Sequence, residues 1–167
     1  MNLRDILTLY DYNYWATHHI LAAGAEVSPE QFTVATTHSF GSLRGTLVHT
    51  LDAENSWRML LQHNTLDFRA MQEEDFPTFE ALQERWQAEE LAMRDFLIHL
   101  TDADLTGMIR YTTDEGVKRE RVLWHCLLHV VNHGTHHRSE AAAILTECGH
   151  SPGELDFTVF LNEQQSS

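Results

Sequence analysis

Four long stretches with helical patterning constrain the fold of this chain more than any other feature. They cover residues 3–25, 42–63, 77–100 and 121–148. The only prolines, Pro29, Pro77 and Pro152, lie at a helix start or beyond a helix end, where proline is tolerated, and none lies in the interior of a stretch. The pattern therefore predicts four long amphipathic helices.

One segment between the third and fourth helices has a different pattern. Residues 108–122 contain Thr-rich and β-branched runs on either side of Asp114-Glu115-Gly116, which is a turn signal. We therefore expect an all-α fold, an up-and-down type four-helix bundle with a small β-hairpin insert before the last long helix. Such bundles build metal and ligand sites from side chains that face their core.

Length and charge limit the classes of function. With 167 residues, 43% of them apolar, residues 1–167 are expected to form a single domain. A net charge of -14 disfavours partners such as nucleic acids and anionic membranes. No apolar run approaches the roughly 18 residues of a membrane helix, and the N-terminus lacks a signal-peptide pattern, so a cytoplasmic location is expected.

The chain contains 12 histidines, and their spacing matters more than their number. Random placement would give roughly one pair at i, i+4. Three such pairs occur in one series, which consists of His125, His129, His133 and His137. This spacing puts imidazoles on one helix face, where two of them can reach a single metal ion.

The direction of each histidine selects one pair from this series. With His133 at 0° and about 100° per residue, His137 lies near +40°, within the apolar arc of the helix. His129, His136 and His125 lie outside that arc and are expected at the rim of the site or in solvent. An inward-facing imidazole needs a partner for its nitrogens, so His133 and His137 are either metal ligands or core histidines hydrogen-bonded to other helices.

A third candidate ligand, His49, lies at the edge of the apolar face of the second long helix. Small residues surround it on its own face: Ser42, Gly45, Thr46, Ala53 and Ser56. They could leave room for an ion and a bound molecule, or they could simply let two helices pack closely. The sequence leaves both readings open.

These segments resemble a known family. LVHTLDAENSW in the second helix, HVVNHGTHHRSEAAAIL in the fourth and LYDYNYWATHHIL in the first resemble the DinB/YfiT-like superfamily of damage-inducible, metal-dependent proteins, which is distinct from the similarly named DNA polymerase. The likeness covers nearly the whole chain. It implies a four-helix bundle, often a homodimer, with one divalent ion on His49, His133 and His137. One departure is that Arg138-Ser139-Glu140 replaces the common Arg-Gly-Gln.

The expected function follows from this set of ligands. Three neutral imidazoles leave at least one coordination position open, as in catalytic zinc sites. The resemblance implies an enzyme that acts on a small molecule, either a transferase for a low-molecular-weight thiol or a hydrolase. The alternative is a non-catalytic metal-binding stress-response protein that acts through dimerisation. Zinc or nickel is expected, and manganese or iron also fits three histidines.

Further residues are candidates for helper roles at this site. Asp52 and Glu140 lie one turn beyond His49 and His137, where each could orient an imidazole or act as a general base, or simply be solvated. Four side chains are expected near the ligands or the pocket: His129, His136, Tyr14 and Trp57.

Overall fold

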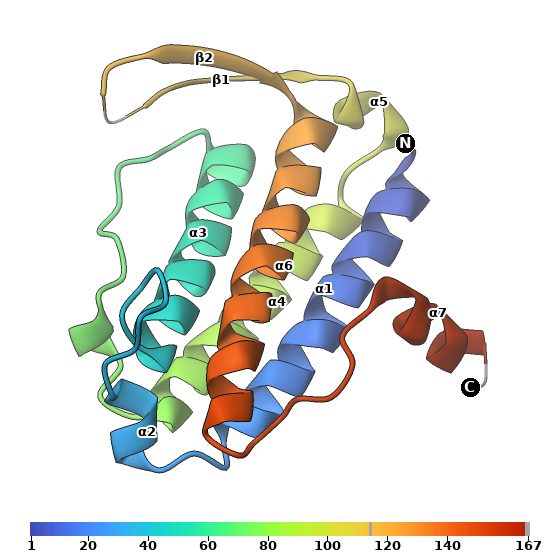
Figure 1. Cartoon of the computed structure of the whole chain (residues 1–167). Coiled ribbons are helices and arrows are strands. Elements are labelled where there is room, and N and C mark those ends of the chain that lie inside the picture. Colours follow the sequence, from blue (N-terminus) through green and yellow to red (C-terminus); the bar gives the residue numbers. More distant parts are fainter. Residues whose placement is uncertain (114, 166–167) are drawn as a thin grey trace.

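The chain is mostly helical, with one two-stranded hairpin before the last long helix, as the sequence predicts. The computed structural model describes residues 1–113 and 115–165. Its long helices are α1 (Leu3–Gly24), α3 (Leu43–His63), α4 (Phe79–Ile98) and α6 (Leu123–Glu147), shown in Figure 1. None of the helices in the described residues is long and apolar enough to cross a membrane.

Short polar side chains define where the helices begin. Asn2, Ser42 and Thr78 each accept a hydrogen bond from a backbone N–H in the first turn of α1, α3 and α4. Helix α3 ends at Asn64, which adopts a left-handed conformation with φ of 52°. These caps explain why the observed bounds of α1, α3 and α4 lie within two residues of the predicted ranges.

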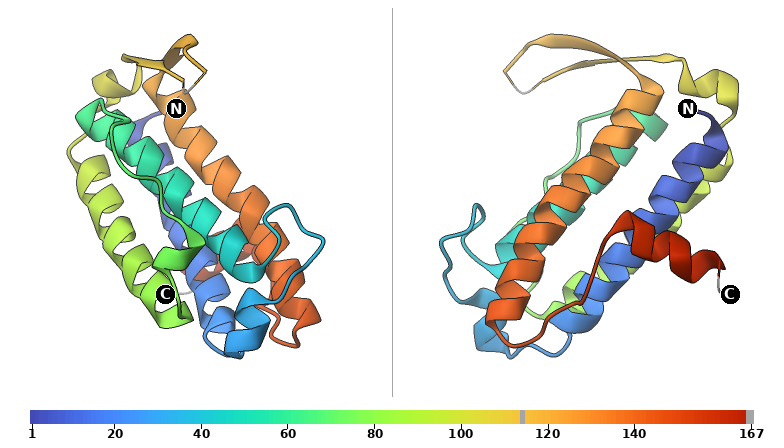
Figure 2. Two further views of the ribbon diagram at one scale, coloured as in Figure 1. Left: turned by 90° about the vertical axis from the view of Figure 1, so that its left-hand side faces the viewer. Right: turned by 45° about the vertical axis from the view of Figure 1, so that its right-hand side comes forward.

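The four long helices pack side by side, and each contacts two of the others (Figures 1 and 2). Helices α3 and α4 run in the same direction, because Asn55 pairs with Arg85, and Arg58 pairs with Glu89 one turn further along both helices. The prediction of an up-and-down type of connection is therefore wrong at this step, since that topology requires successive helices to be antiparallel.

The connection between α3 and α4 explains this difference. Helix α3 has 21 residues and is about 32 Å long. Residues 64–78 can span up to about 50 Å when extended, which is enough to return the chain to the starting end of α3. Figure 1 shows this connector running back along α3, with the short helix η1 (Glu73–Asp75) near its end.

The core consists of two apolar clusters at different heights. One contains Tyr10, Met93 and Leu127, and the other contains Leu47, Trp86 and Ile144. Between these positions along the helices lie buried polar residues: Asn13, Thr17, Glu54, Asn55, Arg58, Glu89 and Arg138. The interior is therefore polar at mid-height, at the level of the histidines of α6.

Short elements cover the ends and one side of the four helices. They are α2 (Pro29–Thr33), α5 (Asp102–Leu105) and the C-terminal α7 (Phe157–Gln165). Phe157 and Phe160 of α7 contact Tyr12 of α1, so the C-terminal segment packs onto the helices. The sequence pattern did not predict that this segment is helical.

The hairpin consists of β1 (Met108–Thr112) and β2 (Lys118–Val122), paired antiparallel with Tyr111 opposite Arg119. Of the predicted turn residues, Asp114 lies outside the described residues, and Gly116 has a φ of 78°. Figure 2 shows the hairpin extending over one end of α3 and α6.

Candidate metal centre

Three histidines from two helices converge at one point. His49 of α3 and His133 and His137 of α6 each offer a ring nitrogen, and these atoms lie within 4.8 Å of one another. The Nε2 atoms of His49 and His133 are 3.2 Å apart. Two nitrogens that bind one tetrahedral ion at 2.0–2.1 Å would lie about 3.3 Å apart. The donor set and its spacing therefore fit a divalent metal ion.

The amphipathic pattern of α6 places the two histidines of that helix. Its predicted apolar arc is buried throughout: Leu123, Cys126, Leu127, Val130, Ala141, Ile144 and Leu145. His133 and His137 lie at the edge of this buried face and are half-buried, whereas His125, His129 and His136 are exposed. Helix α3 packs against α6 and brings His49 to the same edge.

Hydrogen bonding fixes the orientation of His137. Its Nδ1 lies 3.0 Å from Oε2 of Glu140, whose Oε1 accepts a hydrogen bond from the Ser39 hydroxyl at 2.6 Å. These two contacts keep the pKa of Glu140 below its usual value, so the carboxylate is an acceptor. Nδ1 of His137 therefore carries the proton, and Nε2 keeps its lone pair for a metal ion.

The other two histidines are in a setting that favours the neutral form. Burial, together with the neighbouring His137 and His49, lowers the pKa of His133 to about 4. Burial and the nearby His137 also lower the pKa of His49. A metal ligand must be a neutral imidazole, so both rings are ready to bind an ion at neutral pH.

Asp52, the second candidate helper, contacts a different part of the chain. Its Oδ1 accepts a hydrogen bond from the backbone N–H of Met71 at 2.8 Å, which ties the connector between α3 and α4 to α3. The described contacts give Asp52 no hydrogen bond to His49, so its local contacts are structural.

The four residues expected near the ligands or the pocket fall into two groups. The ring of His129 lies 5.7 Å from that of His133, and the ring of His136 lies 6.0 Å from that of His137. Trp57 contacts His129 at 5.1 Å and lines a hollow beside the centre. Tyr14 is fully buried and its hydroxyl donates to Glu54, so it belongs to the core rather than to a pocket.

Two residues before α3 complete the surroundings of the centre, and the sequence did not indicate them. The ring of Phe40 stacks on His49, with centroids 3.9 Å apart and planes at 15°. Ser39 contacts Glu140, as described above. Both residues belong to a loop without a helical or strand pattern, and only their closeness in sequence to His49 could have suggested a role.

The small residues around His49 include one that serves packing. A Cβ atom on Gly45 would lie 2.2 Å from the backbone oxygen of Phe40. Gly45 therefore lets the loop that carries Phe40 approach α3 closely. At this position the packing explanation holds, rather than the explanation of an open groove.

A buried polar network lies behind the histidines and was also not anticipated. Nη1 of Arg138 donates to Oδ1 of Asn13, and Nδ2 of Asn13 lies 3.3 Å from the carboxylate of Glu54. Burial raises the pKa of Glu54 to about 7, although the hydrogen bond from Tyr14 opposes this shift. Polar residues at interior positions of three helices were the available signal in the sequence.

Comparison with known proteins assigns the chain to a family. The chain is 26% identical over 164 residues to Protein DinB of Bacillus subtilis (strain 168), and the match covers 92% of this chain and 91% of that protein. The DinB family model matches residues 1–166. The chain therefore belongs to the DinB family.

Proposed function

We propose that this protein binds one divalent metal ion through His49, His133 and His137 and uses it as a metal-dependent enzyme on a small molecule. The reaction we propose is transfer to or from a low-molecular-weight thiol, or a hydrolysis. The observation that carries the proposal is the approach of three imidazole nitrogens to within 4.8 Å of one another.

The character of the ligand set supports catalysis rather than a purely structural role. Sites with three protein ligands and an open position are typical of catalytic zinc, whereas structural zinc is held by four. No fourth His, Cys, Asp or Glu joins the group within residues 1–113 and 115–165. A divalent ion bound here would supply Lewis acidity for a water molecule or a substrate thiol.

The residues around the ligands have distinct proposed roles. Glu140 fixes the ring of His137 and holds its proton on Nδ1. Phe40 covers one face of His49 and limits the access of water to it. His133 stays neutral because it is half-buried among other imidazoles. Together these contacts pre-orient the three ligands before an ion arrives.

Several finer features belong to the same proposal. We assign the four long helices to the four-helix-bundle class, on the support of the contacts of α1 and α3 with both α4 and α6. Imidazole ligands favour zinc or nickel, and iron or manganese would also fit. We propose a cytoplasmic homodimer, for which the family resemblance is the support.

The test is elemental analysis of purified protein beside three single variants, His49→Ala, His133→Ala and His137→Ala. We expect about one ion per chain in the native protein and a loss of most of it in each variant. His125→Ala and His136→Ala are matched controls, because they remove exposed histidines from the same helix and should retain the ion. Full retention in all three ligand variants would show that the assignment is wrong.

Catalysis is tested separately, with the metal-loaded protein and a panel of thiol-transfer and hydrolase substrates. We expect turnover that disappears in His133→Ala and persists in His99→Ala, which removes an exposed histidine at the end of α4. A protein that binds one ion and turns over neither class of substrate would contradict the enzyme proposal and favour the non-catalytic alternative.

A further inference from the structure

A hollow of about 410 Å³ lies beside the three histidines, between α3, α6 and the hairpin. Its lining residues are Trp57, Tyr111, Arg121, His125, Cys126 and His129. His129 connects the two places, because its ring lies 5.7 Å from that of His133. His125 is two helical turns from His133, about 12 Å along the axis of α6. The hollow therefore adjoins the metal centre at His129.

Aromatic rings form the walls of this hollow. The ring of Trp57 lies 5.8 Å from that of Tyr111 at 79°, and 5.1 Å from that of His129 at 60°. Both Trp57 and Tyr111 are only half-buried, so parts of their surfaces remain open to solvent. Such surfaces favour a flat apolar group, as in many small-molecule sites.

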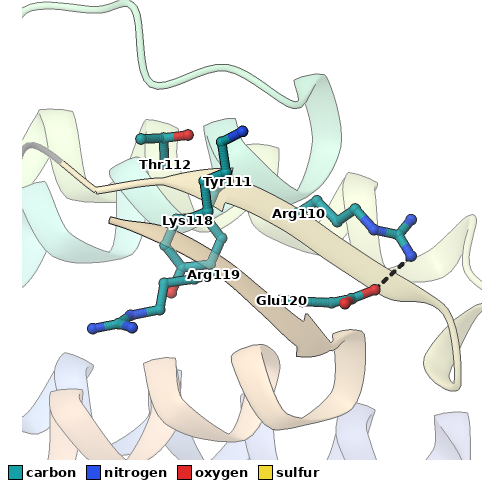
Figure 3. Close-up of a pocket in the computed structure, with 6 residues that line it drawn as sticks. All are labelled: Arg110, Tyr111, Thr112, Lys118, Arg119 and Glu120. Atoms are coloured by element: carbon teal, nitrogen blue, oxygen red, sulfur yellow. Dashed lines mark ion pairs between the residues drawn. The ribbon is translucent and has the colours of Figure 1, made fainter. Parts of the chain in front are cut away.

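The lining of the hollow contains one cation, Arg121, and no carboxylate. The net charge of the protein is -14, yet the 15 residues 108–122 carry four of the 11 lysines and arginines and only three acidic residues. Arg110 pairs with Glu120 at 2.5 Å. Lys118, Arg119 and Arg121 have no carboxylate partner among residues 1–113 and 115–165. Figure 3 shows Arg119 next to Tyr111, its partner across the strands.

The start of α6 adds to this positive potential. No side chain caps its N-terminus, and its first turn carries no acidic residue. The helix dipole therefore contributes a partial positive charge near Arg121. Unpaired cations in an otherwise acidic protein would attract an anion to the hollow, on the side of Arg121.

From these contacts we infer that the hollow binds a small molecule with a flat apolar body and one anionic group, held by Trp57, Tyr111 and Arg121. The inference rests on the proposed function, since it makes this molecule the substrate whose other end reaches the three histidines. The shared chemistry is a carboxylate or phosphate, which Arg binds with its planar fork of donors.

The first test uses metal-free protein, so that the probe cannot bind to an ion. Equilibrium dialysis compares 2-naphthoate with the neutral 2-naphthol. We expect naphthoate to bind about fivefold more tightly, which is the upper end for one exposed charge pair. Arg121→Gln should abolish this preference. Arg4→Gln is the matched control, because it removes an exposed cation at the start of α1 that has no ion pair among the described residues and does not line the hollow, so it should leave the preference intact.

A second measurement tests whether the probe binds in the hollow. The indole N–H resonance of Trp57, assigned with Trp57→Phe, should shift when naphthoate is added, and Tyr111→Ala should weaken the binding of both probes. An arm with 2-naphthyl phosphate distinguishes the two anionic groups, and tighter binding of either anion supports the site. Equal binding of naphthoate and naphthol, or an unchanged preference in Arg121→Gln, would overturn the inference.

This design separates the inference from the proposed function. Arg121→Gln should keep its full metal content, since Arg121 lies in β2, 12 residues before His133, and is not a ligand. A preference for the anion in metal-free protein, with no ion bound under any condition, would support the hollow and contradict the metal centre. Metal binding without any preference for the anion would support the metal centre and contradict the proposed role of the hollow.

Discussion

At the scale of single residues, Glu140 links the ligand His137 to the loop before α3. It contacts the ligand His137, and it accepts a hydrogen bond from Ser39 in the loop before α3. Glu140→Gln should lower metal affinity by about 10- to 100-fold, which is the usual cost of losing an orienting carboxylate. The reason is that the amide no longer holds the proton on Nδ1 as firmly.

The measurement is a metal dissociation constant from competition with a chelator. Glu147→Gln is the control, because Glu147 is an exposed carboxylate near the end of the same helix. An affinity of Glu140→Gln equal to that of the control would mean that the contact with His137 does not contribute to metal binding.

Glu54 is the second residue with a measurable effect, which is on the pH dependence of stability. Its pKa is about 7 in the folded protein and near 4.5 when the chain is unfolded. Between these pH values the unfolded chain binds fewer protons than the native one. The contribution of Glu54 to stability is therefore complete below pH 4.5 and is lost as pH rises through 7, by about 3 kcal/mol in total.

Glu54→Gln removes this dependence. The free energy of unfolding, measured with urea on metal-free protein from pH 4.5 to 8, should decline less with rising pH in the variant. A constant offset is also expected, because the amide group cannot accept both of the hydrogen bonds from Tyr14 and Asn13. Glu26→Gln, at an exposed position, should show the native slope. Parallel curves for Glu54→Gln and the native protein would contradict a raised pKa.

At the scale of elements, the loop before α3 depends on one glycine. An alanine at position 45 should favour the helix by about 1 kcal/mol. Its Cβ would also meet the backbone oxygen of Phe40 at 2.2 Å, and a backbone atom cannot move aside cheaply. We expect the clash to prevail, so that Gly45→Ala destabilises the protein by about 1–3 kcal/mol.

The same variant should weaken metal binding, because a displaced loop takes Phe40 from His49 and Ser39 from Glu140. Urea unfolding and chelator competition measure the two effects. Ser56→Ala, in the same helix, should change stability by less than about 0.5 kcal/mol. Tighter metal binding in Gly45→Ala would mean that the loop strains the centre rather than supports it.

The elements also show what the sequence could predict. Helix bounds followed from capping residues and proline, and the inward face of α6 followed from its apolar arc, which is buried throughout. The direction of α4 did not follow, because a connector of this length can either turn locally or run back along α3. Only contacts such as Arg58 with Glu89 decide between these paths, and they depend on tertiary packing.

At the scale of the whole molecule, the sequence could predict only part of the candidate centre, because a site shared by two helices depends on how they pack. Spacing of i, i+4 along one helix selects His133 and His137, but a partner from another helix depends on how the helices pack. His49 was selected as the third ligand because of its place in the second long helix and because of the resemblance to a family. The contacts of Phe40, Ser39 and Asp52 involve irregular segments, for which periodicity provides no information.

A bound ion would join α3 to α6 and should therefore stabilise the whole fold. Binding to the native state alone adds about 2.7 kcal/mol when free metal is 100 times its dissociation constant. For a chain of this length that corresponds to a rise in Tm of roughly 5–10 °C. Calorimetry of metal-free and metal-loaded protein measures this rise, which should vanish in His49→Ala and persist in His125→Ala.

The rise in Tm should also depend on pH, since each ligand must be a neutral imidazole. Protons compete with the ion as pH falls, so the difference between loaded and metal-free protein should shrink below about pH 6. The low pKa of His133 postpones its own protonation to about pH 4. A full rise in Tm at pH 4 would therefore show that the ion is held by ligands other than these three histidines.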